Sequence, residues 1–144
     1  WRDPITLYTY TLQYAKTARI QNNLGMAYGD SGNLPQAIKH LERSIQLYDG
    51  YPQTYHNLAN AYKSLGKHDL AREGYKKALT IDPYFFFSLN NLIALEIDEK
   101  NWTQAKHWLI YGLEKFPNNE AYASLLRQLE NPQTSIEEIF LREP

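Results

Sequence analysis

The 144-residue chain contains no cysteine, and this absence excludes disulfide bridges, thiolate nucleophiles and cysteine-ligated metal sites. Basic residues are not in excess either, because 15 Lys and Arg stand against 16 Asp and Glu, for a formal net charge of -1. Nucleic-acid binding and binding to an anionic membrane surface usually depend on a basic excess, so we expect neither. No run of about 18 apolar residues occurs, and we therefore expect no direct membrane insertion by this segment.

The residue constellations of an enzyme are also missing. No histidine forms a pair at helical spacing with another histidine, which argues against a metal site; the four are His40, His56, His68 and His107. No serine lies in a nucleophile-elbow context, and the glycines at 25–32 fit no phosphate-binding loop. We predict no catalytic residue, no metal ligand and no cofactor, and hence a chain that is not an enzyme.

The chain begins Trp1-Arg2-Asp3 without a methionine, and we expect it to be a segment of a longer protein. Its length suits one domain with a core of its own. The compartment stays open at this point. It is the cytoplasm, or, if an upstream membrane domain tethers the segment, the periplasm or a lumen.

A repeat of 34 residues runs through the sequence. Asn23 begins the run Asn-Leu-Gly-Met-Ala-Tyr, Asn57 begins Asn-Leu-Ala-Asn-Ala-Tyr, and Asn91 begins Asn-Leu-Ile-Ala-Leu-Glu. Such a period indicates stacked repeats with atypical ends. We predict a single domain over 1–144, made of a flanking helix in 1–17, three units at 18–51, 52–85 and 86–119, and capping helices in 120–144.

Each unit has the pattern of two helices joined by a tight turn. In the second unit, apolar residues recur at three- and four-residue steps until Gly66, which tolerates the positive φ of such a turn. Asp69 is expected to cap the helix that follows. The first unit has Gly32 at the position of Gly66, whereas the third has Lys100 there. Before the first unit, a helix over about 4–16 is expected, with Asp3 as its cap.

The repeat resembles the tetratricopeptide repeat (TPR) family. The second unit matches its pattern most fully, at Leu58, Ala59, Tyr62, Gly66, Ala71, Tyr75, Ala78 and Pro83. The third departs from it, with Ile93, Glu96 and Lys100 at the small, aromatic and glycine positions. The resemblance implies an all-α, right-handed superhelix, an α-solenoid of antiparallel helix pairs. It also implies that the first helices line a groove that binds a peptide or a partner protein in extended conformation.

Some TPR proteins hold the C-terminal acid of chaperones with a clamp of Lys, Asn and Arg, and this sequence departs from that pattern. One clamp position holds Asn22, His56 and Asn90 in the three units, and another holds Met26, Asn60 and Ala94. The clamp lysines are therefore absent, and we do not predict binding of a chaperone tail.

A row of asparagines looks like the asparagine ladder in the TPR region of O-linked N-acetylglucosamine transferase, where amides bond the backbone of an extended polypeptide. An amide offers an acceptor and two donors, which match a peptide unit without reading its side chains. The predicted binding groove comprises Asn22, Asn23, His56, Asn57, Asn60, Phe87, Asn90 and Asn91. Arg19 and Lys63 are predicted at its rim. The alternative is that the asparagines are solvated or bond only to neighbouring repeats.

Two other functions stay open beside a peptide-binding scaffold. Trp1-Arg2-Asp3, Arg19 and Asn22-Asn23-Leu24-Gly25 look like the start of the TPR tail of O-mannosyl-transferring membrane glycosyltransferases, a tail that would aid substrate or partner selection. The apolar run Phe85-Phe86-Phe87 favours either an anchor for a ligand or self-association into a homo-oligomer. In this run we expect one or two rings to be buried and Phe87 to stay partly accessible.

Overall fold

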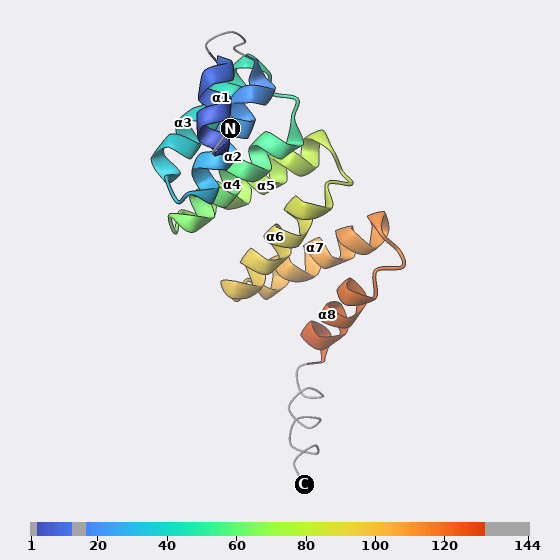
Figure 1. The fold of residues 1–144 in the computed structure, drawn as a ribbon. Coiled ribbons are helices and arrows are strands. Elements are labelled where there is room, and N and C mark those ends of the chain that lie inside the picture. The colour runs from blue at the N-terminus through green and yellow to red at the C-terminus, as the bar shows by residue number, and fades with distance from the viewer. Residues whose placement is uncertain (1–2, 13–16, 132–144) are drawn as a thin grey trace. The chain divides into compact units, whose positions relative to one another are not determined.

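The structure, a computed structural model, describes residues 3–12 and 17–131, and every regular element in these ranges is an α-helix. The eight described helices are α1 (Pro4–Leu12), α2 (Ala18–Asp30), α3 (Leu34–Leu47), α4 (Pro52–Ser64), α5 (His68–Ile81), α6 (Phe86–Asp98), α7 (Trp102–Lys115) and α8 (Glu120–Glu130). The predicted all-α class is thereby confirmed (Figure 1). The end of the predicted 4–16 helix and the capping helix predicted beyond Asn131 lie outside the described residues.

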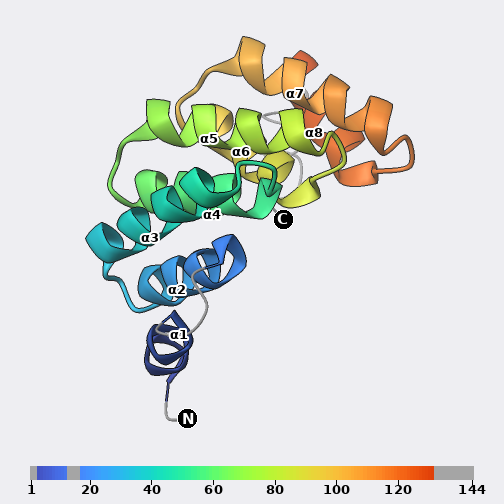
Figure 2. The same ribbon diagram turned by 90° about the horizontal axis from the view of Figure 1, so that it is seen from above.

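The chain forms two compact units, residues 1–88 and residues 89–144. They are larger than the 34-residue repeats, and from here on 'first unit' and 'second unit' refer to these two parts of the chain. In the first unit α1 packs against α2, α2 against α3, α3 against α4 and α4 against α5. Figure 2 shows α2 with α3, and α4 with α5, as adjacent helices that run in opposite directions. In the second unit α7 packs against α8. Helices α2 and α3 lie within 18–51, and α4 and α5 lie within 52–85. The predicted division of the chain into repeat units and capping helices stays a prediction.

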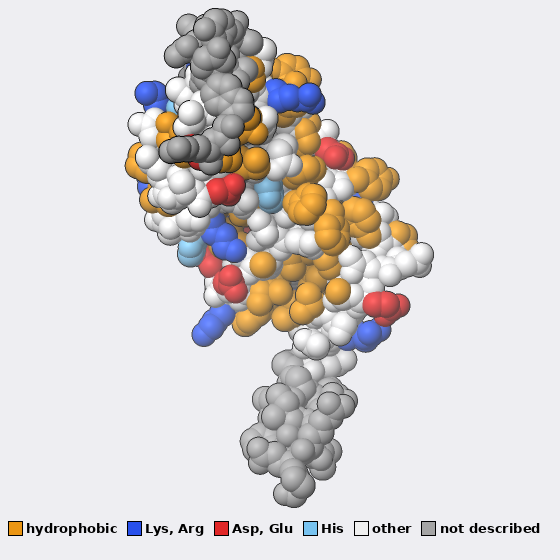
Figure 3. Space-filling model, viewed as in Figure 1, with side chains coloured by type: hydrophobic (Ala, Val, Ile, Leu, Met, Phe, Trp, Pro, Cys, Tyr) orange, Lys and Arg blue, Asp and Glu red, His pale blue; other side chains and the backbone are white. Residues whose placement is uncertain are grey.

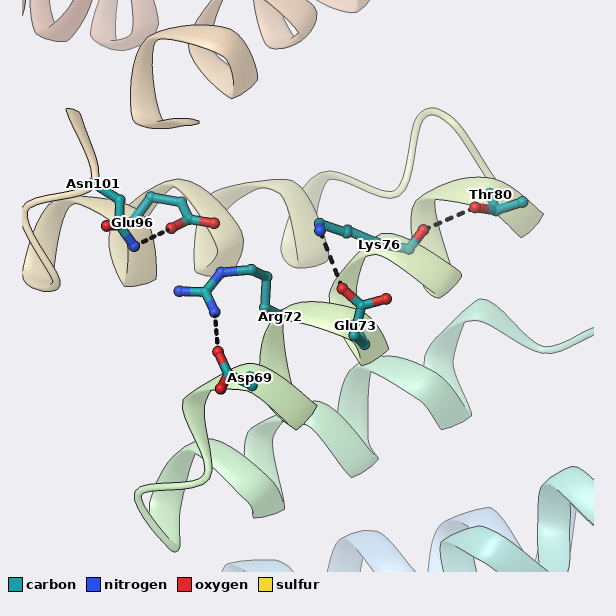
Figure 4. Close-up of polar contacts among 7 residues, drawn as sticks. All are labelled: Asp69, Arg72, Glu73, Lys76, Thr80, Glu96 and Asn101. Carbon is teal, nitrogen blue, oxygen red and sulfur yellow. Dashed lines mark hydrogen bonds and ion pairs between the residues drawn. The ribbon is translucent and has the colours of Figure 1, made fainter. Parts of the chain in front are cut away.

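Side chains that accept hydrogen bonds from the first helical turn explain several helix starts. Asp3 accepts from the Thr6 amide at 2.8 Å, as predicted, and Asn119 accepts from the Tyr122 amide at 3.1 Å. The prediction that Asp69 caps α5 was wrong. Lys67 precedes that helix without a side-chain cap, and Asp69 lies inside the first turn, where it pairs with Arg72 at 2.7 Å (Figure 4). A negative charge there still suits the positive end of the helix.

The three turns between paired helices share one backbone geometry. Gly32 and Gly66 have φ of 79° and 70°, and Lys100 adopts the same left-handed region at 59°. In the Lys100 turn the Asn101 amide donates to the carbonyl of Glu96 at 2.8 Å, and the Asn101 side chain donates to the buried Glu96 carboxylate at 2.9 Å (Figure 4). The third turn is therefore made despite the lysine, at a steric cost that glycine avoids.

We expect Lys100→Gly to raise the free energy of unfolding by about 1 kcal/mol, because glycine removes the contact between Cβ and backbone at positive φ. Urea unfolding followed by circular dichroism measures the change. The reverse substitution, Gly66→Lys, is the matched control and is expected to lower stability by a similar amount. A lower stability for Lys100→Gly would contradict this account of the turn.

Small residues let the helices of the first unit approach closely. Ala37 and Ala71 are fully buried, and a Cβ added at Gly25 would lie 2.6 Å from the Leu41 side chain and 3.1 Å from the Ala37 carbonyl oxygen. Around this contact, Ala37, Leu41 and Leu58 form a buried apolar cluster. Overlap of this size forces neighbours to move, so the position requires a residue without a side chain.

Candidate functional site

In the first unit, one side of α2 and one side of α4 carry most of the predicted site. Residues spaced by three, four, seven and eleven positions share one side of a helix. On α2 these residues are Arg19, Asn22, Asn23, Met26 and Asp30. On α4 they are Gln53, His56, Asn57, Asn60 and Ser64, of which His56 is buried. The helical periodicity therefore gathers polar side chains from two consecutive repeats on one surface.

Two hollows lie along this pair of helices, one toward each end. The first, of about 300 Å³, lies at the start of both helices and is lined by Arg19, Asn22, Asn23, Tyr51, Gln53 and Thr54. The second, of about 200 Å³, extends to the end of both helices. Its polar lining is Asp30, Asn57, Asn60 and Ser64, and its apolar lining includes Met26. Each hollow gives space for a side chain on this surface.

A directed chain of four amides links α4 to α2 beside the hollows. Gln53 donates from Nε2 to Asn57 Oδ1 at 3.0 Å, and Asn57 donates from Nδ2 to Asn22 Oδ1 at 3.1 Å. Asn22 in turn donates from Nδ2 to Asn23 Oδ1 at 3.3 Å. Because each amide uses its donor on the next, the chain ends in an acceptor, Gln53 Oε1, and in a donor, Asn23 Nδ2. Gln53 is exposed and Asn23 is half-buried, so both ends face accessible space.

A second polar chain is buried except at Asn60, which is half-buried and also lines the second hollow, and it contains two of the predicted groove residues. The Tyr75 hydroxyl donates to Asn60 Oδ1 at 2.7 Å, and Asn60 Nδ2 donates to His56 Nε2 at 3.1 Å. The imidazole proton is therefore on Nδ1, where it reaches Ser88 Oγ at 3.0 Å. His56, Tyr75 and Ser88 are buried, and burial lowers the pKa of His56 to about 4. His56 is thus a neutral residue inside the first unit rather than an open contact.

In the second unit, a hydrogen bond between Asn90 and Tyr122 takes the place of the bond between His56 and Ser88. The Tyr122 hydroxyl donates to Asn90 Oδ1 at 2.6 Å, and burial raises the pKa of Tyr122 to about 12. His56 and Ser88 are 32 residues apart, as are Asn90 and Tyr122. One position in the first helix of a repeat therefore bonds to the start of the next repeat in both units. Asn91, beside Asn90 on α6, is half-buried.

Aromatic side chains gather at the start of α6, where Figure 3 shows a hydrophobic surface. Phe87 is 64% exposed and Tyr84 is 61% exposed, whereas Phe85 is half-buried. Phe87 also lies 6.3 Å from the His56 ring between centroids. The ring predicted to be accessible is thus exposed, and self-association through this surface stays a prediction.

The two predicted rim residues differ in position. Arg19 is exposed and lines the first hollow. Lys63 is half-buried near the end of α4 and lines neither hollow. Gln53 and Asp30, which the sequence prediction missed, line the hollows instead. Gln53 precedes Asn57 by one helical turn, and this spacing is a signal that could have identified it.

Other kinds of site were also sought in the described residues. Within 3–12 and 17–131, no group of three histidine, aspartate or glutamate side chains is placed to hold a metal ion. None of the helices in this part of the chain is long and apolar enough to cross a bilayer.

Comparison with known proteins shows what the repeat is similar to. The model of the tetratricopeptide repeat family matches residues 16–83. Hsp70-Hsp90 organizing protein 2 of Arabidopsis thaliana is 27% identical over 105 residues, a match that covers 68% of this chain and 18% of that protein. The chain therefore spans less than a fifth of that relative's length.

Solved structures share the fold. The crystal structure of MamA superposes with a TM-score of 0.73 at 26% identity, over 82% of this chain and 70% of that one. The first TPR domain of Spaghetti (RPAP3), solved with a bound HSP90 peptide, has a TM-score of 0.68 at 21% identity, over 82% of this chain and 96% of that one. These likenesses do not test the asparagine ladder or the glycosyltransferase tail, and both stay predictions.

Proposed function

We propose that the chain binds a partner segment in extended conformation along α2 and α4, since residues 16–83 match the model of the tetratricopeptide repeat family, a family of protein-interaction modules. Binding rather than catalysis is the proposed activity, since the described surface presents amides and hollows and no acid, base or nucleophile arrangement. The ligand is a polypeptide whose backbone stays free of its own secondary structure.

The amide chain is the observation that carries this proposal. Its acceptor, Gln53 Oε1, and its donor, Asn23 Nδ2, are what the N–H and C=O of an extended peptide require. The two inner amides, Asn57 and Asn22, are already bonded to each other and hold the ends in position. Because the helices are preformed, little ordering of the protein opposes binding.

The relatives support a peptide as the class of partner. The RPAP3 domain is solved with an HSP90 peptide, and the Arabidopsis relative is by name an organizer of Hsp70 and Hsp90. The chaperone tail itself is not the proposed ligand. At the clamp positions of the first unit, Asn22 lies in the amide chain and His56 is buried and neutral.

The test starts from peptides selected by the chain from a phage-displayed library of random sequences. We expect the double variant Asn23→Ala, Gln53→Ala to bind a selected peptide about tenfold more weakly, because each lost hydrogen bond costs about 0.5–1.5 kcal/mol. Isothermal titration calorimetry measures the affinity. A peptide N-methylated at one backbone amide after another should lose affinity at the position that contacts Gln53.

Gln46→Ala on α3 is the matched control, since this exposed amide bonds only to Arg43 among the described residues. It should leave the affinity unchanged, and both variants should unfold at nearly the parent temperature. Equal affinity of the parent and the double variant for every selected peptide would reject the amide chain as the binding element.

A further inference from the structure

We propose that the two hollows read opposite charges on the bound segment: the hollow at Arg19 takes an acidic side chain, and the hollow at Asp30 takes a basic one. This inference depends on the proposed function and adds to it a class of ligand sequence. The amide chain alone would accept any extended backbone, whereas a pair of opposite charges at fixed separation selects among sequences.

Each hollow contains one charged residue, and the two charges are opposite. Arg19 is the charged member of the first lining, and Asp30 is the charged member of the second. Both are exposed. Within the described part of the chain, neither forms an ion pair. Their charges therefore face the space that a ligand side chain would enter.

The helix ends reinforce these charges. The Arg19 hollow lies over the first turns of α2 and α4, where the helix dipoles have their positive ends. The Asp30 hollow reaches the last turns of the same two helices, where carbonyl groups give a negative one. Two helix ends and one side chain thus act in the same sense at each hollow.

The lining of the Asp30 hollow also suits a long cationic side chain. Met26, 40% exposed, offers an apolar surface for methylene groups, and Asn57 and Asn60 line the same hollow as Asp30. Gly29 widens this space, because a Cβ added there would meet only the Ala37 Cβ at 3.9 Å. Neither packing nor helix stability requires a glycine at this position, because a Cβ would fit there and glycine weakens a helix interior.

The separation of the charges sets the spacing in the ligand. Arg19 and Asp30 are 11 residues apart on α2, which is about 16 Å along a helix that rises 1.5 Å per residue. An extended peptide advances about 3.3 Å per residue, and its side chains return to the same face at every second residue, so the acidic and basic side chains should be about four or six residues apart. The amide chain binds the backbone between them.

Synthetic ten-residue peptides of alternating Ser and Thr test this proposal. One set has Glu at the third position and Lys at the seventh or the ninth, a second has the reverse order, a third has Gln at both positions, and a fourth has Glu and Lys two residues apart. At low ionic strength we expect one of the first two sets to bind about tenfold more tightly than the Gln set, with threefold from each exposed ion pair. The advantage should shrink as salt is added.

Charge-neutral variants assign each pair. Asp30→Asn should cost about threefold with the Lys-bearing peptide and nothing with the Gln peptide, and Arg19→Gln should do the same for the Glu-bearing peptide. Glu73→Gln and Arg43→Gln, whose side chains bond to Lys76 and Gln46, are the matched controls and should leave the preference intact.

Three outcomes would overturn the inference in distinguishable ways. If the Gln peptide binds and the charged sets bind no better, the charge reading is wrong and the proposed function stands. If no set binds, and no selected peptide binds either, the proposed function fails and this inference with it. A charge preference that Asp30→Asn and Arg19→Gln leave unchanged would also reject these hollows as its source.

Discussion

Gly74→Ala is expected to lower the free energy of unfolding by about 2 kcal/mol, although alanine is normally the better helix former. Gly74 on α5 faces Ala59 on α4, and an added Cβ would lie 2.8 Å from the Ala59 Cβ and 3.2 Å from the Tyr55 carbonyl oxygen. The obstructing atoms belong to a buried alanine and to the backbone, so α4 and α5 would have to move apart. Urea unfolding followed by circular dichroism measures the loss.

Gly29→Ala is the matched control for this effect. Gly29 also lies within a helix, but its added Cβ would meet only an ordinary contact. We expect this variant to be more stable than the parent by about 0.5–1 kcal/mol, because alanine restricts the unfolded chain and favours the helix. Stabilisation by both substitutions would show that the α4–α5 contact is looser than the structure indicates.

The second large effect is on the pH dependence of stability. His56 has a pKa of about 4 in the folded chain because burial disfavours its charged form, against about 6.5 when unfolded. Above pH 6.5 His56 is neutral in both the folded and the unfolded chain, so its burial causes no pH-dependent loss of stability there. As the pH falls from 6.5 to 4, His56 becomes protonated in the unfolded chain but stays neutral in the folded chain. The free energy of unfolding should therefore fall by up to about 3 kcal/mol. Urea unfolding at intervals across this range measures the slope.

His56→Gln should remove most of that slope, since glutamine keeps a polar group beside Asn60 and does not titrate in this range. His107→Gln, at an exposed position on α7, is the control and should leave the slope as it is. His40 should add a smaller slope of the same sign, because burial, together with the charge of Lys39, lowers its pKa. Identical slopes for the parent and His56→Gln would show that the buried chain around His56 does not control the acid response.

Particular residues show how far the sequence alone could lead to the site. The 34-residue interval placed Asn23 and Asn57 on first helices, and the structure has them on α2 and α4. The same interval could not distinguish Asn57, on an accessible amide chain, from His56 and Asn60, in a buried one. Neighbouring positions on one helix differ in what the next helix places against them, and that depends on contacts between repeats.

The helix pairs, their turns and the shared face of α2 and α4 follow from the sequence by itself. Periodicity, small residues and left-handed turn positions are local properties that act within a few residues of the chain. Only the tertiary structure decided which polar groups are joined across 32 to 35 residues, and that Arg19 and Asp30 each line a hollow. Hydrogen bonds and hollows of this kind exist only after separate helices have packed, because each is made by side chains from more than one of them.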